Sequence, residues 1–303
     1  MPVSDLETAL KRMPIFAGAT GVTTTRLAGL TNINHLVVVG DDRFVVRLPG
    51  EGTSEYINRG EEEVAARSAA ACGVNAEVIF FDATDGLMVT RFIDDSTTMD
   101  AEQFTDLGAV ARAGHAFRRL HSTAAPFATD FKLFPMIDEY KALLSSKGAT
   151  LPHGYETVQR QAERVRAALE DAPVSLVPCH CDPLCENFLD TGERMYIIDY
   201  EYAGNNDPMW DLGDLSVEGG FAPNQDEALL RAYFDGEPPP SQRGRMIAYK
   251  ALCDLLWTLW GVIQHVNGNP ADDFWAYAVG RFERCKALMS TPGFDAEVAA
   301  ISR

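Results

Sequence analysis

The sequence lacks the segments that mark several common classes of protein. It has no G-x-x-x-x-G-K-[ST] stretch, which argues against a P-loop nucleotide fold, and no G-x-G-x-x-G stretch either. Basic residues are scarce, because 26 Lys and Arg stand against 44 Asp and Glu, for a formal net charge of −18. Binding of nucleic acid or an anionic membrane needs clustered Lys and Arg. We therefore expect no nucleic-acid partner.

Long apolar runs are missing as well. The N-terminal residues MPVSDLETALKRMP contain no hydrophobic core of a signal peptide. The most apolar stretch, residues 251–263, is shorter than the roughly 20 residues that a membrane span needs. We therefore expect a cytoplasmic protein without a membrane span. Its six cysteines are expected to be free thiols, because no secretory signal accompanies them.

What the chain does contain is a change of pattern near residue 93. Before it, β-branched and apolar runs predict five short antiparallel strands, over 23–27, 36–39, 43–48, 77–81 and 87–92. Two helices are predicted there, over 4–13 and 54–72. The polar stretch 94–100 reads as a hinge. After it, helical periodicity dominates, over 101–122, 135–146, 156–171, 226–234, 245–266 and 272–288. The sequence thus predicts an α+β chain of two lobes, 1–93 and 94–303.

The most informative segment is HCDPLCEN at 180–187, followed by a strand-like run that ends at Asp199. The spacing H-x-D-x-x-x-x-N is that of the catalytic loop of protein kinases, and Asp199 fits their second metal-binding acid. Phosphoryl transfer needs a positioned hydroxyl and metal ions on the phosphates. Asp182 would accept a hydrogen bond from the attacking hydroxyl, and His180 would orient the loop. Asn187 and Asp199 would supply the oxygen ligands that Mg²⁺ prefers.

Other interpretations of this segment stay open. Cys179, Cys181 and Cys185 with His180 would make a zinc cluster, although C-x-C-x₃-C is not the spacing of structural zinc sites. A protein kinase is disfavoured, because the D-F-G and A-P-E ends of an activation segment are missing. Further along, Asp211 is expected to brace the catalytic loop.

The first lobe offers candidate groups for binding phosphate. The turn GLTNIN at 29–34, with Thr31 and Asn32, either presents backbone N–H groups and hydroxyls to phosphate oxygens or is an ordinary hairpin turn. Arg47 ends the third expected strand, where protein kinases carry the Lys that binds the α- and β-phosphates. Glu62 on the following helix is its expected ion-pair partner. The register of this partner stays open, because acidic residues flank Glu62 on both sides.

These segments together resemble the choline/ethanolamine kinase family, inside the wider group of aminoglycoside-phosphotransferase-like kinases. The resemblance is carried by LAGLTNIN (27–34), FVVRLPGEGTSEYINRGEE (44–62), HCDPLCENF (180–188), IIDYEYAGNNDPMWDLGDLSVE (197–218) and LLWTLWGVI (255–263). It implies a bilobal protein-kinase-like fold, ATP and Mg²⁺ as cofactors, and adenine bound by the backbone between Thr90 and Phe92. One residue departs from the pattern: Leu184 stands where eukaryotic choline kinases carry Gln.

The resemblance also implies an acceptor site. Trp257 and Trp260 lie three residues apart and so share a helix face, and Tyr277 follows on the next expected helix. In the family, such rings form part of a box for a quaternary ammonium group, which has no N–H to donate. Glu218 resembles an acidic residue that adds negative charge near the cation. Taken without the kinase motif, two aromatic residues at this spacing are more typical of a hydrophobic core.

We therefore predict ATP-dependent phosphorylation of a small amino alcohol, choline first and ethanolamine next. An aminoglycoside or another small alcohol is an alternative acceptor. A non-catalytic choline-binding module is the alternative of another class; it predicts loss of Asp182, Asn187 or Asp199, and all three are present. The sequence does not determine the oligomeric state, and a homodimer is one of the assemblies that it allows.

Overall fold

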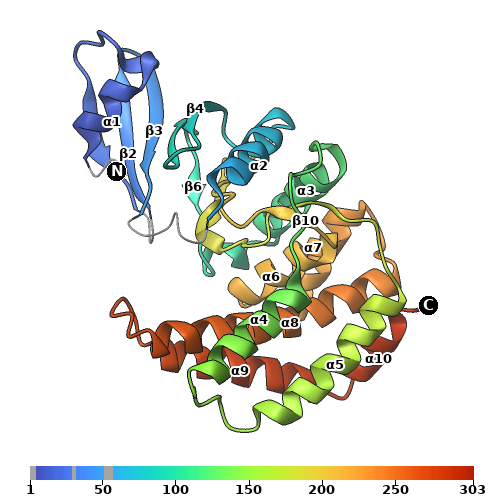
Figure 1. Ribbon diagram of the computed structural model, residues 1–303. Coiled ribbons are helices and arrows are strands. Elements are labelled where there is room, and N and C mark those ends of the chain that lie inside the picture. The colour runs from blue at the N-terminus through green and yellow to red at the C-terminus, as the bar shows by residue number, and fades with distance from the viewer. Residues whose placement is uncertain (1–4, 29–31, 51–56) are drawn as a thin grey trace.

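The computed structural model describes residues 5–28, 32–50 and 57–303. Near the N-terminus, five antiparallel strands form one sheet in the order β1-β2-β3-β5-β4. They are β1 (Thr23–Arg26), β2 (Ile33–Val39), β3 (Asp42–Leu48), β4 (Val78–Asp82) and β5 (Leu87–Arg91). The sheet lies at one end of the molecule and long helices lie at the other (Figure 1). The prediction of an α+β fold with a five-stranded antiparallel sheet is confirmed.

The two helices of this first part begin later than predicted. Helix α2 (Arg59–Ala71) begins after Asn58, whose side chain accepts hydrogen bonds from the N–H groups of Gly60 and Glu61. The predicted start at residue 54 is therefore wrong for residues 57–58, and residues 51–56 lie outside the described part of the chain. Helix α1 (Leu6–Arg12) is capped by Asp5, whose side chain accepts a hydrogen bond from the Thr8 N–H at 2.8 Å, and residue 4 also lies outside the described part.

The second part of the chain is mainly helical. Its longer helices are α3 (Leu107–Thr123), α4 (Leu133–Ser146), α5 (Tyr155–Asp171), α7 (Pro223–Phe234), α8 (Pro240–Val266) and α9 (Phe274–Met289). Two helices were not predicted, α6 (Pro208–Glu218) and α10 (Phe294–Ala300). The short strands β7 (Val177–Cys179) and β10 (Gly204–Asn206) pair with each other. The strands β6 (Thr97–Thr98), β8 (Phe188–Asp190) and β9 (Met195–Ile197) form a second small sheet.

Two buried clusters support these parts. The smaller one packs α1 against the first sheet, for example Ala9 against Val37 and Val89. The larger one fills the helical part and also takes in Ala65, Ala66 and Ala69 of α2. Helix α2 therefore packs across the predicted boundary between the lobes. The boundary at residues 93/94 stays a prediction.

Helix α8 is the centre of the helical part. By length and composition it could cross a membrane, but 83% of its apolar window is buried inside the protein. Burial by neighbouring elements is typical of a core helix. Helix α9 approaches α8 closely at Gly261, where an added Cβ would lie 2.7 Å from the Tyr277 ring. The small residue thus lets the Tyr277 ring pack against α8.

Candidate active site

The predicted catalytic residues lie on one loop between β7 and β8. His180 is fully buried, and its Nε2–H donates to the carbonyl oxygen of Ile198 at 2.8 Å. Burial lowers the pKa of His180, and the hydrogen bond to Ile198 fixes the ring against the segment before Asp199. Asn187 Nδ2 donates to the Asp182 carbonyl oxygen at 3.1 Å. This bond closes the loop and leaves the amide oxygen of Asn187 for another partner.

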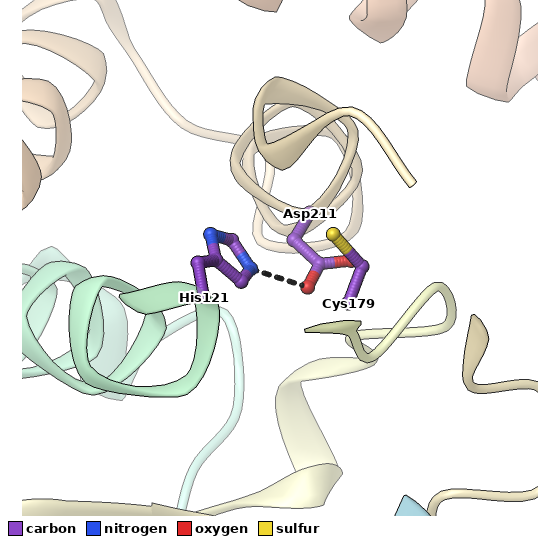
Figure 2. Close-up of side chains that lie close together, drawn as sticks. All are labelled: His121, Cys179 and Asp211. Carbon is purple, nitrogen blue, oxygen red and sulfur yellow. Dashed lines mark hydrogen bonds and ion pairs between the residues drawn. The ribbon is translucent and has the colours of Figure 1, made fainter. Parts of the chain in front are cut away.

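A carboxylate from α6 braces this loop. Asp211 accepts hydrogen bonds from the backbone N–H groups of His180, at 2.7 Å, and Cys181, at 2.8 Å. It also lies 3.0 Å from His121 Nε2 (Figure 2). The other ring nitrogen of His121 is 3.0 Å from the Tyr233 hydroxyl. Cys181, directly before Asp182, has a φ of 66°, a left-handed conformation that is costly for a residue with a Cβ. Asp211 therefore holds a strained backbone in place beside Asp182, as the sequence suggested.

The geometry does not support a zinc cluster on this loop. All six cysteines are free and buried. Burial raises the pKa of Cys179 and Cys181 well above the ordinary value, which disfavours the thiolates that zinc needs. Cys179 does lie beside His121 and Asp211 (Figure 2), but the oxygens of Asp211 already accept backbone hydrogen bonds. Within the described residues, none of the clusters of potential metal ligands contains two cysteines.

The second predicted metal ligand follows β9. Asp199 has a φ of 68°, and its Oδ1 is buried without a hydrogen-bond partner. Its carboxylate clusters with those of Glu62 and Glu201, with ligand atoms within 4.8 Å of one another. Burial and the neighbouring Glu201 raise the pKa of Asp199 to about 7. Glu201 was missed from the sequence, although two acids in alternate positions after a strand were a usable signal.

Arg47 lies across from Asp199 and is buried. It forms the expected ion pair with Glu62, and its Nη1 also lies 3.5 Å from Asp199 Oδ1 and 3.6 Å from Glu201 Oε1. Arg59 joins the same network, with Nη1 at 2.6 Å from Glu62 and 2.7 Å from Glu201. Two guanidinium groups and three carboxylates thus connect β3 and α2 to the segment after β9. The role of Arg47 in phosphate binding stays a prediction.

The other residues predicted to bind nucleotide are placed less simply. Asn32 donates to Glu201 Oε1 at 2.9 Å and accepts from the Gly50 N–H at 3.0 Å, so it ties its turn to the network. Thr31 lies outside the described residues. Thr90 lies within β5, and the Phe92 N–H donates to the Arg43 carbonyl oxygen at 3.0 Å. That amide is committed to the sheet, and the adenine contact stays a prediction for the other backbone groups of 90–92.

The predicted acceptor residues do come together. The rings of Trp257 and Trp260 on α8 are 6.1 Å apart, and the Tyr277 ring on α9 is 5.7 Å from that of Trp260, all edge to face. Phe274, at 5.5 Å from Trp260, and Tyr202, at 6.5 Å from Trp257, extend the cluster. Both of these were missed from the sequence. Trp257, Trp260 and Tyr277 are each only half-buried, as a cluster that lines a binding site requires.

A cation of the protein itself lies at this end of the site. Arg281 is buried, with Nη1 at 2.5 Å from Glu218 Oε1 and 3.3 Å from Asp254 Oδ1. Its guanidinium group also lies over the Tyr277 ring, at 5.0 Å from the centroid. Glu218, predicted to face an external cation, is thus already paired. Sequence reasoning missed Arg281, although it follows Tyr277 by one helical turn.

The acceptor end and the catalytic loop share one electrostatic environment. Burial, together with the carboxylates of Glu218 and Asp199, raises the pKa of Asp182 to about 7 against the opposite effect of Arg281. Asp182 therefore interacts with both the carboxylate at Asp199 and the ion pair of Glu218 with Arg281. These groups define the site of a kinase-like phosphotransferase. The site combines a catalytic carboxylate, oxygen ligands for a metal ion, an aromatic cluster and the buried ion pair of Arg47 with Glu62.

Comparisons with known proteins agree with this class. The model of the family described as "Phosphotransferase enzyme family" matches residues 23–246. The crystal structure of a choline/ethanolamine kinase family protein from Mesorhizobium loti is 56% identical, with a TM-score of 0.90 and 97% of each chain covered. The choline kinase LicA from Streptococcus pneumoniae is 27% identical, with a TM-score of 0.75, over 94% of this chain and 98% of that one.

Two further relatives complete the comparison. Protein LicA from Haemophilus influenzae is 28% identical over 269 residues, which are 87% of this chain and 78% of that protein. A structure of LicA in complex with AMP is 28% identical, with a TM-score of 0.69, over 89% of this chain and 92% of that one. The chain therefore belongs to the choline/ethanolamine kinases of the phosphotransferase enzyme family. The prediction of a small-molecule kinase that uses a nucleotide is confirmed.

Proposed function

We propose that this kinase transfers the γ-phosphoryl group of ATP to the hydroxyl group of choline, with ethanolamine as a weaker acceptor. The observation that carries the proposal is that Asp182 interacts electrostatically with Glu218 and with Tyr277, a member of the aromatic cluster of Trp257, Trp260 and Tyr277. Ring faces attract a trimethylammonium group, whereas the primary ammonium of ethanolamine needs hydrogen-bond acceptors. In this site Arg281 already forms an ion pair with Glu218, so this carboxylate is not available to a primary ammonium group. The pairing therefore favours choline over ethanolamine.

Asp182 would act on the acceptor hydroxyl. Its carboxylate accepts a hydrogen bond from that hydroxyl and orients the oxygen toward the phosphorus. Asp211 and His180 would position the backbone rather than act on the substrate, since Asp211 accepts from the His180 N–H of the loop and the His180 ring donates to the Ile198 carbonyl oxygen, directly before Asp199. Arg47 would bind the phosphate oxygens through the N–H groups that face the Asp199 carboxylate.

The residues at Asp199 fit a magnesium ion. The buried Oδ1 of Asp199 has no hydrogen-bond partner. Asn187 uses its amide nitrogen to donate to the Asp182 carbonyl oxygen, so its amide oxygen can bind a metal ion. Both are hard oxygen donors of the kind that Mg²⁺ takes. Bound there with ATP, Mg²⁺ would neutralise charge on the phosphates. We further propose that residues 1–93 bind the nucleotide, that residues 94–303 carry the acceptor, and that the protein acts in the cytoplasm.

The test is Mg·ATP-dependent release of ADP with choline, ethanolamine, related amino alcohols and an aminoglycoside panel. The proposal expects the highest kcat/KM with choline. Asp182→Ala should abolish turnover and leave nucleotide binding intact, whereas Glu186→Gln, an exposed substitution on the same loop, should be neutral. A higher kcat/KM with an aminoglycoside than with choline would refute choline as the acceptor. Full activity of Asp182→Ala would refute the role of Asp182.

A further inference from the structure

One cavity, lined by residues of α2, α3 and the turn before β9, lies away from the proposed active site. It has a volume of about 920 Å³ and is bounded by the C-terminal end of α2, one side of α3 and the turn before β9. Helices α2 and α3 lie side by side there (Figure 1). Glu62, in the ion-pair network, lies near the other end of α2, about 13 Å along the helix from Ala71 at a rise of about 1.5 Å per residue. The cavity and the proposed phosphate site therefore lie at opposite ends of one helix.

The charge of this cavity is opposite to that of the chain. Four arginines line it, Arg112, Arg118, Arg119 and Arg194, together with His115. Glu193 is the single acidic residue in the lining. Elsewhere acids outnumber bases so strongly that the chain carries a net charge of −18. A cationic cavity in so acidic a protein locally attracts anions that the rest of the surface repels.

Two of these arginines approach each other without a counter-ion. The Nη2 atoms of Arg119 and Arg194 each lie 3.5 Å from the point where a Cβ on Gly73 would be. They are therefore within about 7 Å of one another, a distance at which like charges repel appreciably unless an anion lies between them. Arg119 donates to the Cys72 carbonyl oxygen and Arg194 to the Gly73 carbonyl oxygen. Within the described residues, neither forms an ion pair with a carboxylate.

The other two arginines of the cavity, Arg112 and Arg118, have carboxylate partners. An anion is therefore expected at Arg119 and Arg194, which have none among the described residues. Arg112 is held by Asp190 through two hydrogen bonds of 2.8 and 2.6 Å, and Arg118 lies 3.3 Å from Asp235. Arg119 and Arg194 thus remain as the uncompensated pair, at the end of α2. The hydroxyl groups of Ser122 and Thr123 donate to carbonyl oxygens of α3 and keep only acceptor capacity. The donors that face an anion are therefore those of the two guanidinium groups, together with the ring of His115 in the lining.

The floor of the cavity is apolar. Val74, Ala116 and Met195 are buried and form part of its wall. The volume exceeds what a bare phosphate ion fills and lies in the range of small-molecule sites. Guanidinium groups bind phosphate in a bidentate manner, and an apolar floor favours a ligand with an apolar body. We propose that this cavity binds a small phosphate monoester with an apolar substituent, at a site separate from that of the proposed reaction.

Such a ligand would hold Arg119 and Arg194 in the positions from which they donate to the Cys72 and Gly73 carbonyl oxygens, and so would strengthen the contact between the end of α2 and the helical part of the molecule. The cavity wall already carries a link between them, in which the Ile197 N–H donates to the Val74 carbonyl oxygen at 3.0 Å. A phosphate shared by Arg119 on α3 and Arg194 before β9 would relieve the repulsion at the end of α2. The ligand should therefore raise the unfolding temperature of the protein.

Phenyl phosphate is the probe, with inorganic phosphate and phenol as partial probes. Binding is measured by calorimetry and thermal unfolding in saturating Mg·ADP and choline, so that occupation of the active site is not counted. We expect phenyl phosphate to bind more tightly than inorganic phosphate, phenol not to bind, and the affinity to fall as salt rises. The double variant Arg119→Gln/Arg194→Gln should lose about tenfold or more in affinity, equivalent to about 1.4 kcal/mol. The matched control Arg160→Gln/Arg164→Gln, which removes the same charge from α5, should bind as the wild type does.

Several results would overturn the proposal. No binding of phenyl phosphate by the wild type would do so, as would equal binding by the double variant and the wild type. Binding that disappears in saturating Mg·ADP and choline would assign the probe to the active site. If the double variant does not fold, Arg194→Gln alone, on an exposed turn, should still weaken binding several-fold. Because activity is not the readout, failure here leaves the proposed function untouched.

Discussion

Replacing Asp211 by Asn should uncouple the catalytic loop from α6. The carboxylate is fully buried and accepts two backbone hydrogen bonds, from His180 and Cys181. An amide offers one oxygen, so one buried N–H loses its partner and faces an N–H instead. A hydrogen bond to a charged group contributes about 1.5–3 kcal/mol, and an unsatisfied buried donor costs a further 1–3 kcal/mol. Release of the strained Cys181 backbone returns roughly 1 kcal/mol, so the free energy of unfolding should fall by about 1.5–5 kcal/mol.

Two measurements check this result. Denaturant unfolding should show the loss of stability, and the melting temperature should fall by roughly 10 °C, since each kcal/mol shifts it by about 2–4 °C in large domains. Under conditions where the variant is folded, kcat should drop by about 100-fold, because a displacement of about 1 Å at the reacting groups has such an effect. Nucleotide affinity should stay unchanged. The matched control is Asp235→Asn at the exposed end of α7, where Asn also tolerates the left-handed backbone. If the Asp211→Asn variant had the stability and the kcat of the wild type, Asp211 would not hold the catalytic loop in place.

The remaining predictions concern the acceptor and the phosphate groups. Trp257→Ala should raise the KM for choline at least tenfold and leave the KM for ATP unchanged, whereas Trp275→Ala, outside the aromatic cluster, should change neither; steady-state kinetics decides, and equal changes in both KM values would contradict the box. Arg281→Met leaves the carboxylate of Glu218 without its nearest cation, so stability should fall by about 3 kcal/mol and the preference for choline over ethanolamine should shrink; an unchanged ratio of kcat/KM values would contradict that role. Arg47→Met should weaken ATP binding, measured by calorimetry, and ATP affinity equal to that of the wild type would remove Arg47 from the phosphate site.

Local spacing explains what could be predicted of the site. His180, Asp182 and Asn187 share one loop, so their separation along the chain fixes their neighbourhood in space. The pairing of Arg47 with Glu62 followed from placing one at the end of a strand and the other on the next helix. Alternation and helical period predicted the strands of the sheet and the longer helices, although α3 begins at Leu107 rather than at residue 101 and α8 at Pro240 rather than at residue 245. Residue spacing, strand alternation and helical periodicity all depend on residues that are close in the sequence. They therefore predict the parts of the structure that local interactions determine.

Contacts between distant segments could not be predicted in the same way. Arg281 on α9 meets Glu218 on α6 because both helices pack against α8, and no sequence period predicts that packing. Helix α6 was missed because Pro, Gly and Asp are weak helix formers, and almost complete burial stabilises it instead. The amide of Phe92 is used by Arg43 only because the pairing of β3 and β5 extends past the strand end. Register and packing, rather than propensity, decide such cases.

The six buried thiols can report local unfolding of the protein. An alkylating reagent reaches a thiol only after the surrounding structure separates, and the cysteines sample different places, from Cys72 at the end of α2 to Cys285 within α9. The order in which they are modified would rank the local stability of each region, with no introduced label. Slower modification of Cys72 in the presence of a ligand would then show which end of the molecule that ligand holds closed.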